Sequence, residues 1–450
     1  MSFLKNIVLL VCVAATVCSC KKSNTTPQGN TFIKVFEEPT LAFNAGPNSF
    51  QSNTGDVVSD DAGNYYCWYY EQNTAAGGWA TKLAILKTDP NGNKLWSRVY
   101  FSFHVAAYSW NRRAIMYNNF ICDGQSLYIA GTNTDGAPYM LKFNSDGDVI
   151  AQMPLDIIPQ GRTLHALYNL WPLSNGNFMI NGTYSIATGP TKGDDGGTIP
   201  FVAMISPSGG ILWQNNELPF PLQDTNADNA TIEGMAEMPD GGYIFSGTGA
   251  YSTDNTTLSG KKTTFINVYK LNSGGQLEYN KTLYGGQYIE TRGSSTTFAL
   301  LTDHDLQFSQ VLMMPSGDPL LIMAILQNNS GDFSIRLMKL DASSGSPVDS
   351  SDINGGDALY LRKAINRSDG NILINACTRF NTTTQSKLYT VGSDLHIMNT
   401  ATFSFPNESI YTSGLCEVGG DHYLLPGTIQ TFGNDSSSLM MIKTNGNGQY

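Results

Sequence analysis

The chain has 450 residues, of which 41% are hydrophobic, 11% are aromatic and only 14% are charged, and it contains 45 glycines. Its 26 Lys and Arg against 37 Asp and Glu give a formal net charge of −11, which argues against nucleic acid or an anionic membrane surface as a partner. The apolar and aromatic content excludes a disordered chain, and the abundance of Gly, Asn, Thr and Tyr predicts a turn-rich all-β protein.

The first residues are expected to be an export signal. Lys5 supplies a positive charge, and residues 7–17 form an apolar core that is too short to span a bilayer. The core ends in Val17-Cys18-Ser19-Cys20, which resembles a bacterial lipobox. The resemblance implies that residues 1–19 are removed and that Cys20 is lipidated. An ordinary secretion signal with incidental cysteines is the alternative.

Residues 20–30 are predicted to be the lipidated cysteine and a flexible tether, because residues 21–30 are polar, contain Pro and Gly and show no apolar periodicity. Such an anchor holds the mature domain at a membrane. By resemblance to other lipoproteins, Lys21-Lys22 is not the acidic signal that retains a protein at the inner membrane, so the outer membrane is expected. The periplasmic and surface sides are both left open.

Residues 31–450 contain a motif that recurs seven times: a short turn with Gly, followed by an apolar strand that often closes on Gly-Thr. The marker glycines of these turns are Gly63, Gly124, Gly176, Gly241, Gly317, Gly370 and Gly420. A second half-motif follows each one, made of an apolar strand, a turn and another strand, as in residues 83–100 and 139–152. Asn-Gly, Asp-Gly and Ser-Gly between apolar runs are hairpin signals, because these turns require positive φ.

Each repeat therefore predicts four strands. Four-stranded units of this kind, repeated four to eight times, are typical of a β-propeller, and seven units predict seven blades. Six or eight blades, or two stacked β domains, are the alternatives. The last repeat ends in a short strand, so we expect residues 31–43 to complete a blade by pairing with the C-terminal strand, which would remove a free sheet edge.

The turns DPNGNKLW (89–96) and SPSGGILW (206–213) resemble those of bacterial propellers of the PQQ-like and kelch-like kind. With the lipobox, the whole chain resembles a propeller lipoprotein of the Bacteroidetes type. The resemblance implies the architecture and, by itself, no particular activity.

The mature chain retains four cysteines besides Cys20, namely Cys67, Cys122, Cys377 and Cys416. Disulfides are permitted outside the cytoplasm, but no CxxC or dense framework is present. Buried free thiols are the favoured interpretation, and the three possible pairings are left open.

No motif in the sequence predicts a particular catalytic chemistry. The adjacent cysteines of quinoprotein dehydrogenases are missing, and residues 206–213 keep only part of the sialidase turn. The histidines lack zinc-ligand spacing, and neither GxSxG nor a P-loop occurs. We therefore expect no cofactor. We also expect a binding protein in preference to an enzyme.

One acidic run could hold calcium. Oxygen side chains alternate along this loop, and Ca²⁺ takes six to eight oxygen ligands. The candidate ligands are Asp224, Asn226, Asp228 and Glu233. A solvated loop between blades is the alternative, since the spacing does not match an EF-hand.

In a propeller, the segment that leads into each innermost strand lies near the mouth of the central channel. Aromatic and Arg side chains there are favoured for binding, and Tyr or Trp faces suit sugar rings. The candidate ligand-binding residues are Tyr108, Trp110, Arg112, Arg113, Arg162, His165, His304, Tyr360, Arg362 and Tyr411. The alternative is that some of them cap the channel and bond to backbone.

These features predict a membrane-anchored binding or scaffold module for a protein or glycan partner. The competing hypothesis is a carbohydrate-active enzyme, a glycosidase or polysaccharide lyase, with Arg112, His165 and Tyr360 around the channel mouth.

Overall fold

The computed structural model describes residues 31–40, 54–71, 82–100, 103–104, 119–133, 136–185, 198–216, 218–219, 227–252, 260–291, 297–300, 304–327, 332–354, 359–380, 383–431 and 437–450. Every regular element in these ranges is a β-strand. Within the same ranges, no helix has the length and apolar character needed to cross a membrane. The predicted signal, lipidated cysteine and tether lie outside the described residues.

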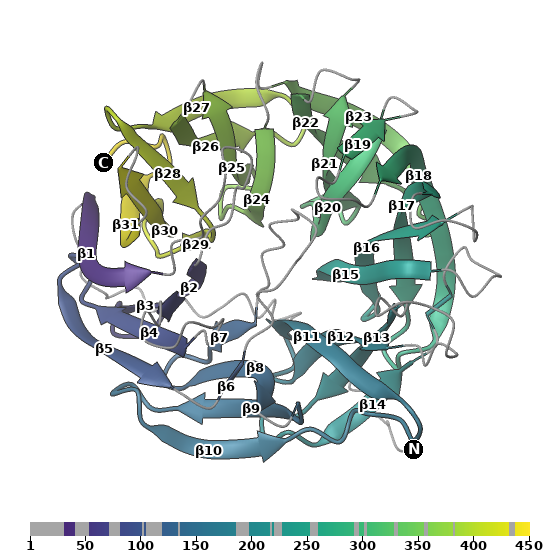
Figure 1. Ribbon diagram of the computed structural model, residues 1–450, viewed down its shortest axis with the longest axis horizontal. Helices are drawn as coiled ribbons and strands as arrows, with labels where there is room; N and C mark the ends of the chain where they lie inside the picture. The colour runs from purple at the N-terminus through teal and green to yellow at the C-terminus, as the bar shows by residue number, and fades with distance from the viewer. Residues whose placement is uncertain are drawn as a thin grey trace, which may run out of the picture.

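The strands form seven antiparallel blades arranged as a ring, which confirms the predicted seven-bladed β-propeller (Figure 1). Blade 1 contains β2 (Thr54–Ser59), β3 (Tyr65–Glu71), β4 (Lys82–Thr88) and β5 (Lys94–Tyr100). Blade 2 contains β6 (Phe103–His104) and β7 (Phe120–Cys122), then β8 (Leu127–Asn133), β9 (Pro138–Phe143) and β10 (Val149–Pro154). Blade 3 contains β11 (Thr163–Pro172), β12 (Phe178–Ser185), β13 (Thr198–Ile205) and β14 (Ile211–Asn215).

Blade 4 has the longest strands, namely β15 (Ala227–Glu237), β16 (Tyr243–Ser252), β17 (Gly260–Leu271) and β18 (Leu277–Thr291), and β19 (Thr297–Leu300) pairs with the end of β18. Blade 5 contains β20 (His304–Met313), β21 (Pro319–Gln327), β22 (Asp332–Leu340) and β23 (Pro347–Asn354). Blade 6 contains β24 (Leu359–Asn366), β25 (Ile372–Phe380), β26 (Thr383–Val391) and β27 (Ile397–Phe403).

Blade 7 is shared between the two ends of the chain, as the sequence predicts. Its inner strands are β28 (Glu408–Thr412), β29 (Cys416–Glu417), β30 (His422–Thr431) and β31 (Ser437–Asn445), and its outermost strand is β1 (Phe32–Thr40). β1 pairs with β31 from Phe32↔Lys443 to Thr40↔Ser437. At its far end β1 also meets blade 1 through the pair Thr40↔Glu71, so the ring is closed by hydrogen bonds.

The two faces of the ring are built differently. At one face, which we call the tight-turn face, the first strand of each blade turns into the second and the third into the fourth, through short turns such as residues 60–64 and 89–93. At the opposite face, which we call the loop face, the chain joins the second strand to the third and leaves for the next blade. Those connections range from residues 381–382 to residues 105–119.

The tight turns share one local structure. At Asp89 the carboxylate accepts hydrogen bonds from the backbone N–H groups of Asn91 and Asn93, at 2.9 and 2.8 Å, and Asn144, Asn272 and Asn445 repeat this pattern. All seven marker glycines have positive φ, between 57° and 98°. The prediction from the Asp-Gly and Asn-Gly turns is therefore confirmed.

The apolar core is divided into seven clusters, and each lies between two neighbouring blades. In β21, for example, Leu320 and Ile322 pack towards blade 6, whereas Leu321 and Met323 pack towards blade 4. Both faces of a blade are thus buried, which explains why the strands are continuous apolar runs instead of alternating ones.

The Trp of the repeated turns also packs between blades. A Cβ on Gly147, in the turn of blade 2, would lie 2.7 Å from the ring of Trp96 in blade 1, and one on Gly275 would lie 2.3 Å from the ring of Trp213. Met153, Tyr279, Ala401 and Phe32 meet the corresponding turn glycine of the following blade in the same way. The Trp-containing turns therefore hold neighbouring blades together.

All four described cysteines are free. Cys67 and Cys377 are buried, and Cys122 and Cys416 are half-buried. Burial raises the pKa of the Cys122 thiol to about 12, so this thiol is protonated and unreactive at neutral pH.

Candidate binding site at the loop face

The predicted ligand-binding residues that the structure describes lie at the loop-face ends of the innermost strands. Arg162 directly precedes β11 and His165 lies within it. His304 begins β20, Tyr360 and Arg362 lie in β24, and Tyr411 lies in β28. The remaining candidates, Tyr108, Trp110, Arg112 and Arg113, lie outside the described residues.

The innermost strands are interrupted by β-bulges. In the pairing of each innermost strand with its neighbour, the register skips His165 and Tyr168 in β11, Asp228 and Glu233 in β15, and Arg362 in β24. A bulge leaves one residue outside the ladder and re-aims its side chain, and bulges are common next to functional sites. Several predicted residues are therefore set apart from the regular pleat.

The Gly of the repeated Gly-Thr explains how a bulge is accommodated. A Cβ on Gly182, Gly247 or Gly427 would lie 2.3 Å from the carbonyl oxygen of Ala166, Thr231 or Tyr411, respectively, on the innermost strand. Only a residue without a side chain permits this approach. The Gly-Thr repeat therefore marks the place where the inner strand bends.

His165, Tyr360 and Tyr411 all reach solvent, His165 the most. Desolvation lowers the pKa of His165 below its ordinary value, so its imidazole is neutral at pH 7 and can both donate and accept a hydrogen bond. A neutral imidazole and two phenol rings suit uncharged polar groups such as hydroxyls and amides.

Arg162 is held by contacts within its own region. Its guanidinium lies 5.7 Å from the centre of the Tyr184 ring and donates to the carbonyl of Asn216 at 3.3 Å. The Tyr184 hydroxyl donates to the carbonyl of Ile157, and Gln214 Nε2 lies 2.6 Å from that hydroxyl. Arg162 thus presents a positive charge from a fixed position on blade 3.

Deeper in the ring, one polar residue from the innermost strand of most blades contacts the innermost strand of another blade. We call this set the inner polar ring, and it consists of Asp56, Asn169, Glu233, Gln310, Lys363 and Ser413. Of these residues, only Glu233 was predicted from the sequence as a site residue.

The contacts of the inner polar ring run from blade to blade. Asn169 donates to the carbonyl of Ile232 at 3.3 Å, and Glu233 accepts from the backbone N–H of Ser309 at 2.7 Å. Gln310 makes two hydrogen bonds to the backbone of Ala364, at 2.7 and 2.8 Å. These bonds satisfy backbone groups that the bulged strands would otherwise bury without partners.

The remaining contacts of the inner polar ring lie where blades 6 and 7 meet blade 1. Ser413 donates to the carbonyl of Gly55 at 2.8 Å. Lys363 of blade 6 forms an ion pair with Asp56 of blade 1 and so spans blade 7. Gly414 makes room for this pair, because a Cβ there would lie 2.6 Å from the Asp56 carboxylate.

Two of the predicted site residues are buried. Arg362 is 1% exposed and Glu233 is 5% exposed. The Glu233 carboxylate accepts hydrogen bonds from Thr231, Thr248 and Ser309. This arrangement joins blades 4 and 5.

Among the described residues, no cluster of three His, Cys, Asp or Glu side chains could hold a metal ion. Asp224 and Asn226 lie outside these residues, and only the backbone of Asp228 is described. The predicted calcium site therefore stays a prediction, and Glu233 would have to exchange its present partners to join it.

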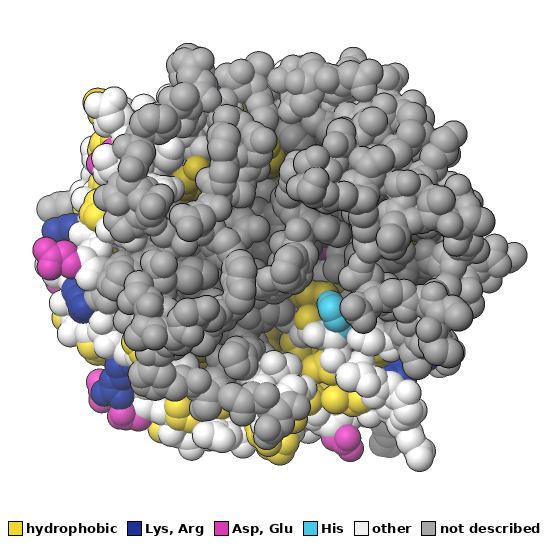
Figure 2. Space-filling view, viewed as in Figure 1, with side chains coloured by type: hydrophobic (Ala, Val, Ile, Leu, Met, Phe, Trp, Pro, Cys, Tyr) yellow, Lys and Arg dark blue, Asp and Glu magenta, His cyan; other side chains and the backbone are white. Residues whose placement is uncertain are grey.

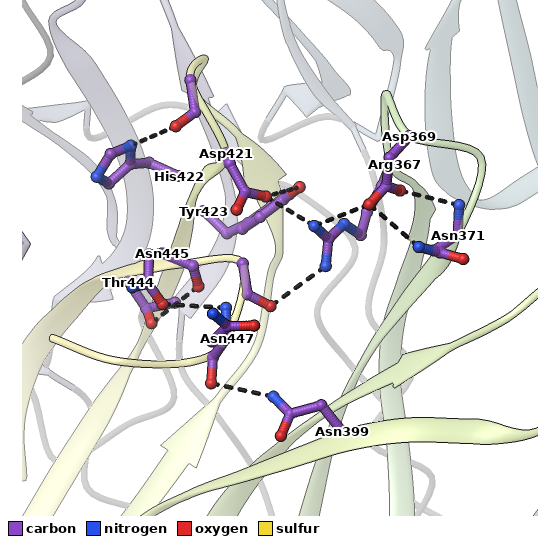
Figure 3. Close-up of polar contacts among 12 residues, drawn as sticks. Arg367, Asp369, Asn371, Asn399, Asp421, His422, Tyr423, Thr444, Asn445 and Asn447 are labelled. Atoms are coloured by element: carbon purple, nitrogen blue, oxygen red, sulfur yellow. Dashed lines mark hydrogen bonds and ion pairs between the residues drawn. The ribbon is translucent and has the colours of Figure 1, made fainter.

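A second polar cluster lies at the tight-turn face, between blades 6 and 7 (Figure 3). Arg367 approaches Asp421 at 2.8 Å and Asp369 at 3.0 Å, donates to the carbonyl of Gly446 at 3.2 Å, and lies 5.5 Å from the centre of the Tyr423 ring. Lys270 with Asp240 and Lys339 with Asp318 form similar ion pairs in other blades. The Arg367 cluster is thus one of several groups of paired charges at the tight-turn face.

The sequence did contain a signal for the inner polar ring. A polar residue stands seven positions before the marker glycine in five repeats, at Asp56, Asn169, Gln310, Lys363 and Ser413. In repeat four the corresponding Glu233 stands eight positions before Gly241. A polar side chain at a fixed place in a buried strand requires a partner, and the ring geometry supplies it from another blade.

Comparison with known proteins gives structural likenesses only, since no family model and no curated protein matches the chain. A protein of unknown function from Dyadobacter fermentans aligns over 91% of this chain and 99% of its own, with 10% identity and a TM-score of 0.48. The polysaccharide lyase Uly1 aligns over 90% and 92%, with 9% identity and a TM-score of 0.48. The NanB sialidase from Streptococcus pneumoniae aligns over 92% and 71%, with 14% identity and a TM-score of 0.41.

Proposed function

We propose that the protein is an extracytoplasmic lipoprotein, anchored at the outer membrane through Cys20, whose propeller binds a protein or glycan partner at the loop face. The observation that carries this proposal is the placement of His165, Tyr360 and Tyr411 at the loop-face ends of three innermost strands, all reaching solvent. Connections of unequal length leave the ring at this same face, and loops on a rigid scaffold are where binding residues concentrate.

The chemistry of these side chains favours uncharged polar ligands. Tyr rings give a large contact area at low entropic cost, and their hydroxyls and a neutral imidazole bond to hydroxyl or amide groups. The positive charge of Arg162 adds a contact for a carboxylate. Sugars, particularly acidic ones, and polar peptide segments both meet this description.

Binding is tested with the full chain on a glycan array and by capture of purified candidate partners. We expect His165→Ala and Tyr411→Ala each to weaken binding about 10-fold, the loss typical of a residue at a binding hot spot. His396→Ala is the matched control, since His396 is an exposed histidine at the tight-turn face. Equal losses in all three variants would contradict a site at the loop face.

The same preparations decide between binding and catalysis. Incubation of every bound glycan with the protein, followed by product analysis, reveals hydrolysis or elimination. Turnover that is lost in His165→Ala and Tyr360→Ala would support the carbohydrate-active enzyme instead of the binding module.

The anchor and the calcium site need separate tests. A Cys20→Ala chain that stays in the membrane fraction would refute lipidation at that residue. For calcium, we expect the ion to raise the melting temperature of the unmodified chain but not of Asp224→Ala, and an identical rise in both would exclude Asp224 as a ligand.

A further inference from the structure

The large apolar side chains that the described residues expose are not scattered over the molecule. Nine of the ten most exposed lie on the outermost strands of the seven blades, and each blade contributes at least one. We call one residue per blade, taken from this set, the apolar margin. It comprises Val35, Leu95, Ile150, Leu212, Leu277, Val348 and Met398, with exposures from 40% to 64%.

The apolar margin lies near the tight-turn face. Leu277 is the first residue of its strand, and Leu95, Ile150, Leu212, Val348 and Met398 are each the second, directly after the tight turn. At the left and lower edges of Figure 2, where described residues are visible, apolar side chains lie between charged ones. The same strand position is thus exposed and apolar in five of the seven blades, whereas Leu277 lies one residue earlier and Val35 is the fourth residue of β1. This recurrence requires an explanation beyond blade packing, because exposed apolar residues that are scattered singly have no reason to recur at one place.

The chain enters the fold at this same edge. β1 begins at Phe32, which pairs with Lys443 beside the last tight turn. Phe32 also packs against the turn of blade 1, where a Cβ on Gly92 would lie 2.5 Å from its ring. The segment that precedes Phe32 therefore starts from the tight-turn face.

The length of that segment limits the distance between the ring and a lipid on Cys20. Twelve residues span at most roughly 40 Å when fully extended. As a flexible chain they span about 20 Å on average. A blade strand of eight residues is itself roughly 26 Å long, so the tether readily brings the tight-turn face to the membrane but seldom reaches past the loop face.

We infer that the tight-turn face rests against the lipid bilayer through the apolar margin and that the loop face points away from it. This inference rests on the proposed lipid anchor. Beyond the anchor, the inference defines the orientation of the propeller, in which the proposed binding site faces away from the membrane and is accessible to partners.

The charges at the tight-turn face indicate what kind of bilayer is favoured. Several carboxylates there are paired with cations, as in Arg98 with Asp148, Lys339 with Asp318 and Arg367 with Asp421. The chain as a whole is acidic, with a net charge of −11. Contact with lipid must therefore depend on apolar side chains, and we expect it to persist at high salt and to be stronger on neutral than on anionic vesicles.

The test uses the full lipidated chain reconstituted in phosphatidylcholine vesicles with brominated acyl chains, which quench nearby tryptophans. Trp96 and Trp213 follow Leu95 and Leu212 directly and are two of the six tryptophans in the chain. If both reach the apolar region of the interface, the emission falls by up to about a third relative to unbrominated vesicles.

The decisive variant is L95S/I150S/L212S/V348S/M398S, which changes only exposed side chains and should fold normally. We expect it to float with the vesicles through its lipid and to lose most of the quenching. A Q152S/T402S variant, changed at exposed polar positions on β10 and β27, is the control and should keep the quenching.

Each other outcome overturns the inference in a recognisable way. A chain that floats but shows no quenching refutes the orientation and leaves the anchor intact. A chain that does not float refutes the anchor and the orientation together. A vesicle-free dimer that is abolished by the five substitutions would assign the apolar margin to a second copy of the chain.

Discussion

The tight-turn face and the loop face of this propeller come from the same strands but follow different rules. At the tight-turn face, every blade has two short turns, each with a residue in the left-handed region. In the second turn of every blade, an Asp, Asn or Ser side chain also bonds to the turn backbone. At the loop face the connections differ in length from blade to blade. The motifs that repeat in the sequence therefore correspond to the turns of the tight-turn face, and not to the connections of the loop face.

This difference separates structural residues from candidate functional ones. The turn glycines, the Trp and Tyr that pack on them and the ion pair of Arg367 with Asp421 hold neighbouring blades together. The exposed His165 and the half-buried Tyr360 and Tyr411 belong to the other end of the strands. A regular scaffold leaves one end free to vary without loss of the fold.

The largest effect is expected from removal of the closing strand. Deletion of residues 31–40, with residues 1–30 retained, removes the ladder between β1 and β31 and takes Phe36 out of the core. We expect the free energy of unfolding to fall by about 5 kcal/mol or more, which is enough to abolish cooperative folding. Thermal unfolding followed by circular dichroism measures it.

Lys34→Ala, in the same strand, is the control for this deletion, since the Lys34 side chain makes an exposed hydrogen bond to Asn93. Its expected cost is within about 0.5 kcal/mol. A stable, monomeric deletion variant would show that the ring does not need its hydrogen-bonded closure.

The next effect concerns the ion pair that spans blade 7. Asp56→Asn and Lys363→Met each leave the other residue without its ionic partner, and we expect each to lower the free energy of unfolding by about 2–4 kcal/mol. In the double variant, a coupling energy of about 1–3 kcal/mol is expected from urea denaturation. Additive losses would mean that the two residues stabilise the ring independently.

A smaller effect separates packing between blades from backbone strain. Gly275 and Gly176 have nearly the same φ, 80° and 81°, but only at Gly275 would a Cβ meet a neighbour, the Trp213 ring at 2.3 Å. Gly176→Ala should cost about 1–2 kcal/mol from the left-handed backbone alone. Gly275→Ala should cost about 1–3 kcal/mol more from overpacking, and equal melting temperatures would disprove the packing role.

The smallest effect is a pH dependence at the seam between blades 7 and 1. Burial lowers the pKa of Lys443 from 10.5 to about 8, and its ammonium donates to the carbonyl of Pro90 at 3.3 Å. Between these two values the unfolded chain binds more protons than the folded one, so stability rises with pH. From pH 8 to pH 10, the free energy of unfolding of the unmodified chain should rise by about 1 kcal/mol relative to that of Lys443→Met, after allowance for solvent screening.

Urea denaturation at several pH values measures this gain, and Lys94→Met, at an exposed lysine of β5, serves as the control. A difference between the unmodified chain and Lys443→Met that stays constant over this range would show that Lys443 does not lose its proton early.

The architecture was predictable because its signals are local. An Asp-Gly or Asn-Gly turn between apolar runs has one low-energy solution, and all seven marker glycines adopt it. The short last repeat also indicated that residues 31–43 close the ring. The second turn of blade 6 follows the same conformation without glycine, because Leu395 takes a φ of 64° and is buried in the core between blades 5 and 6.

The candidate site was less predictable because it depends on contacts between blades. The loop-face position of His165, Tyr360 and Tyr411 follows from counting residues, whereas the burial of Arg362 and Glu233 does not. The bulges shift these side chains by one residue relative to simple alternation. In the sequence, only the Gly-Thr pairs indicated the bulges. Lys363 and Asp56 are 307 residues apart, so no local pattern could have joined them.

The closure of blade 7 has a consequence for how the chain folds. Ile33 pairs with Ile442, so the first strand to be synthesised must wait for the last one before it has a partner on that side. Contacts between such distant residues form slowly, because a very long loop has to close first. Ring closure is therefore expected as the final step of folding, and chains truncated near the C-terminus should remain open and exposed to degradation.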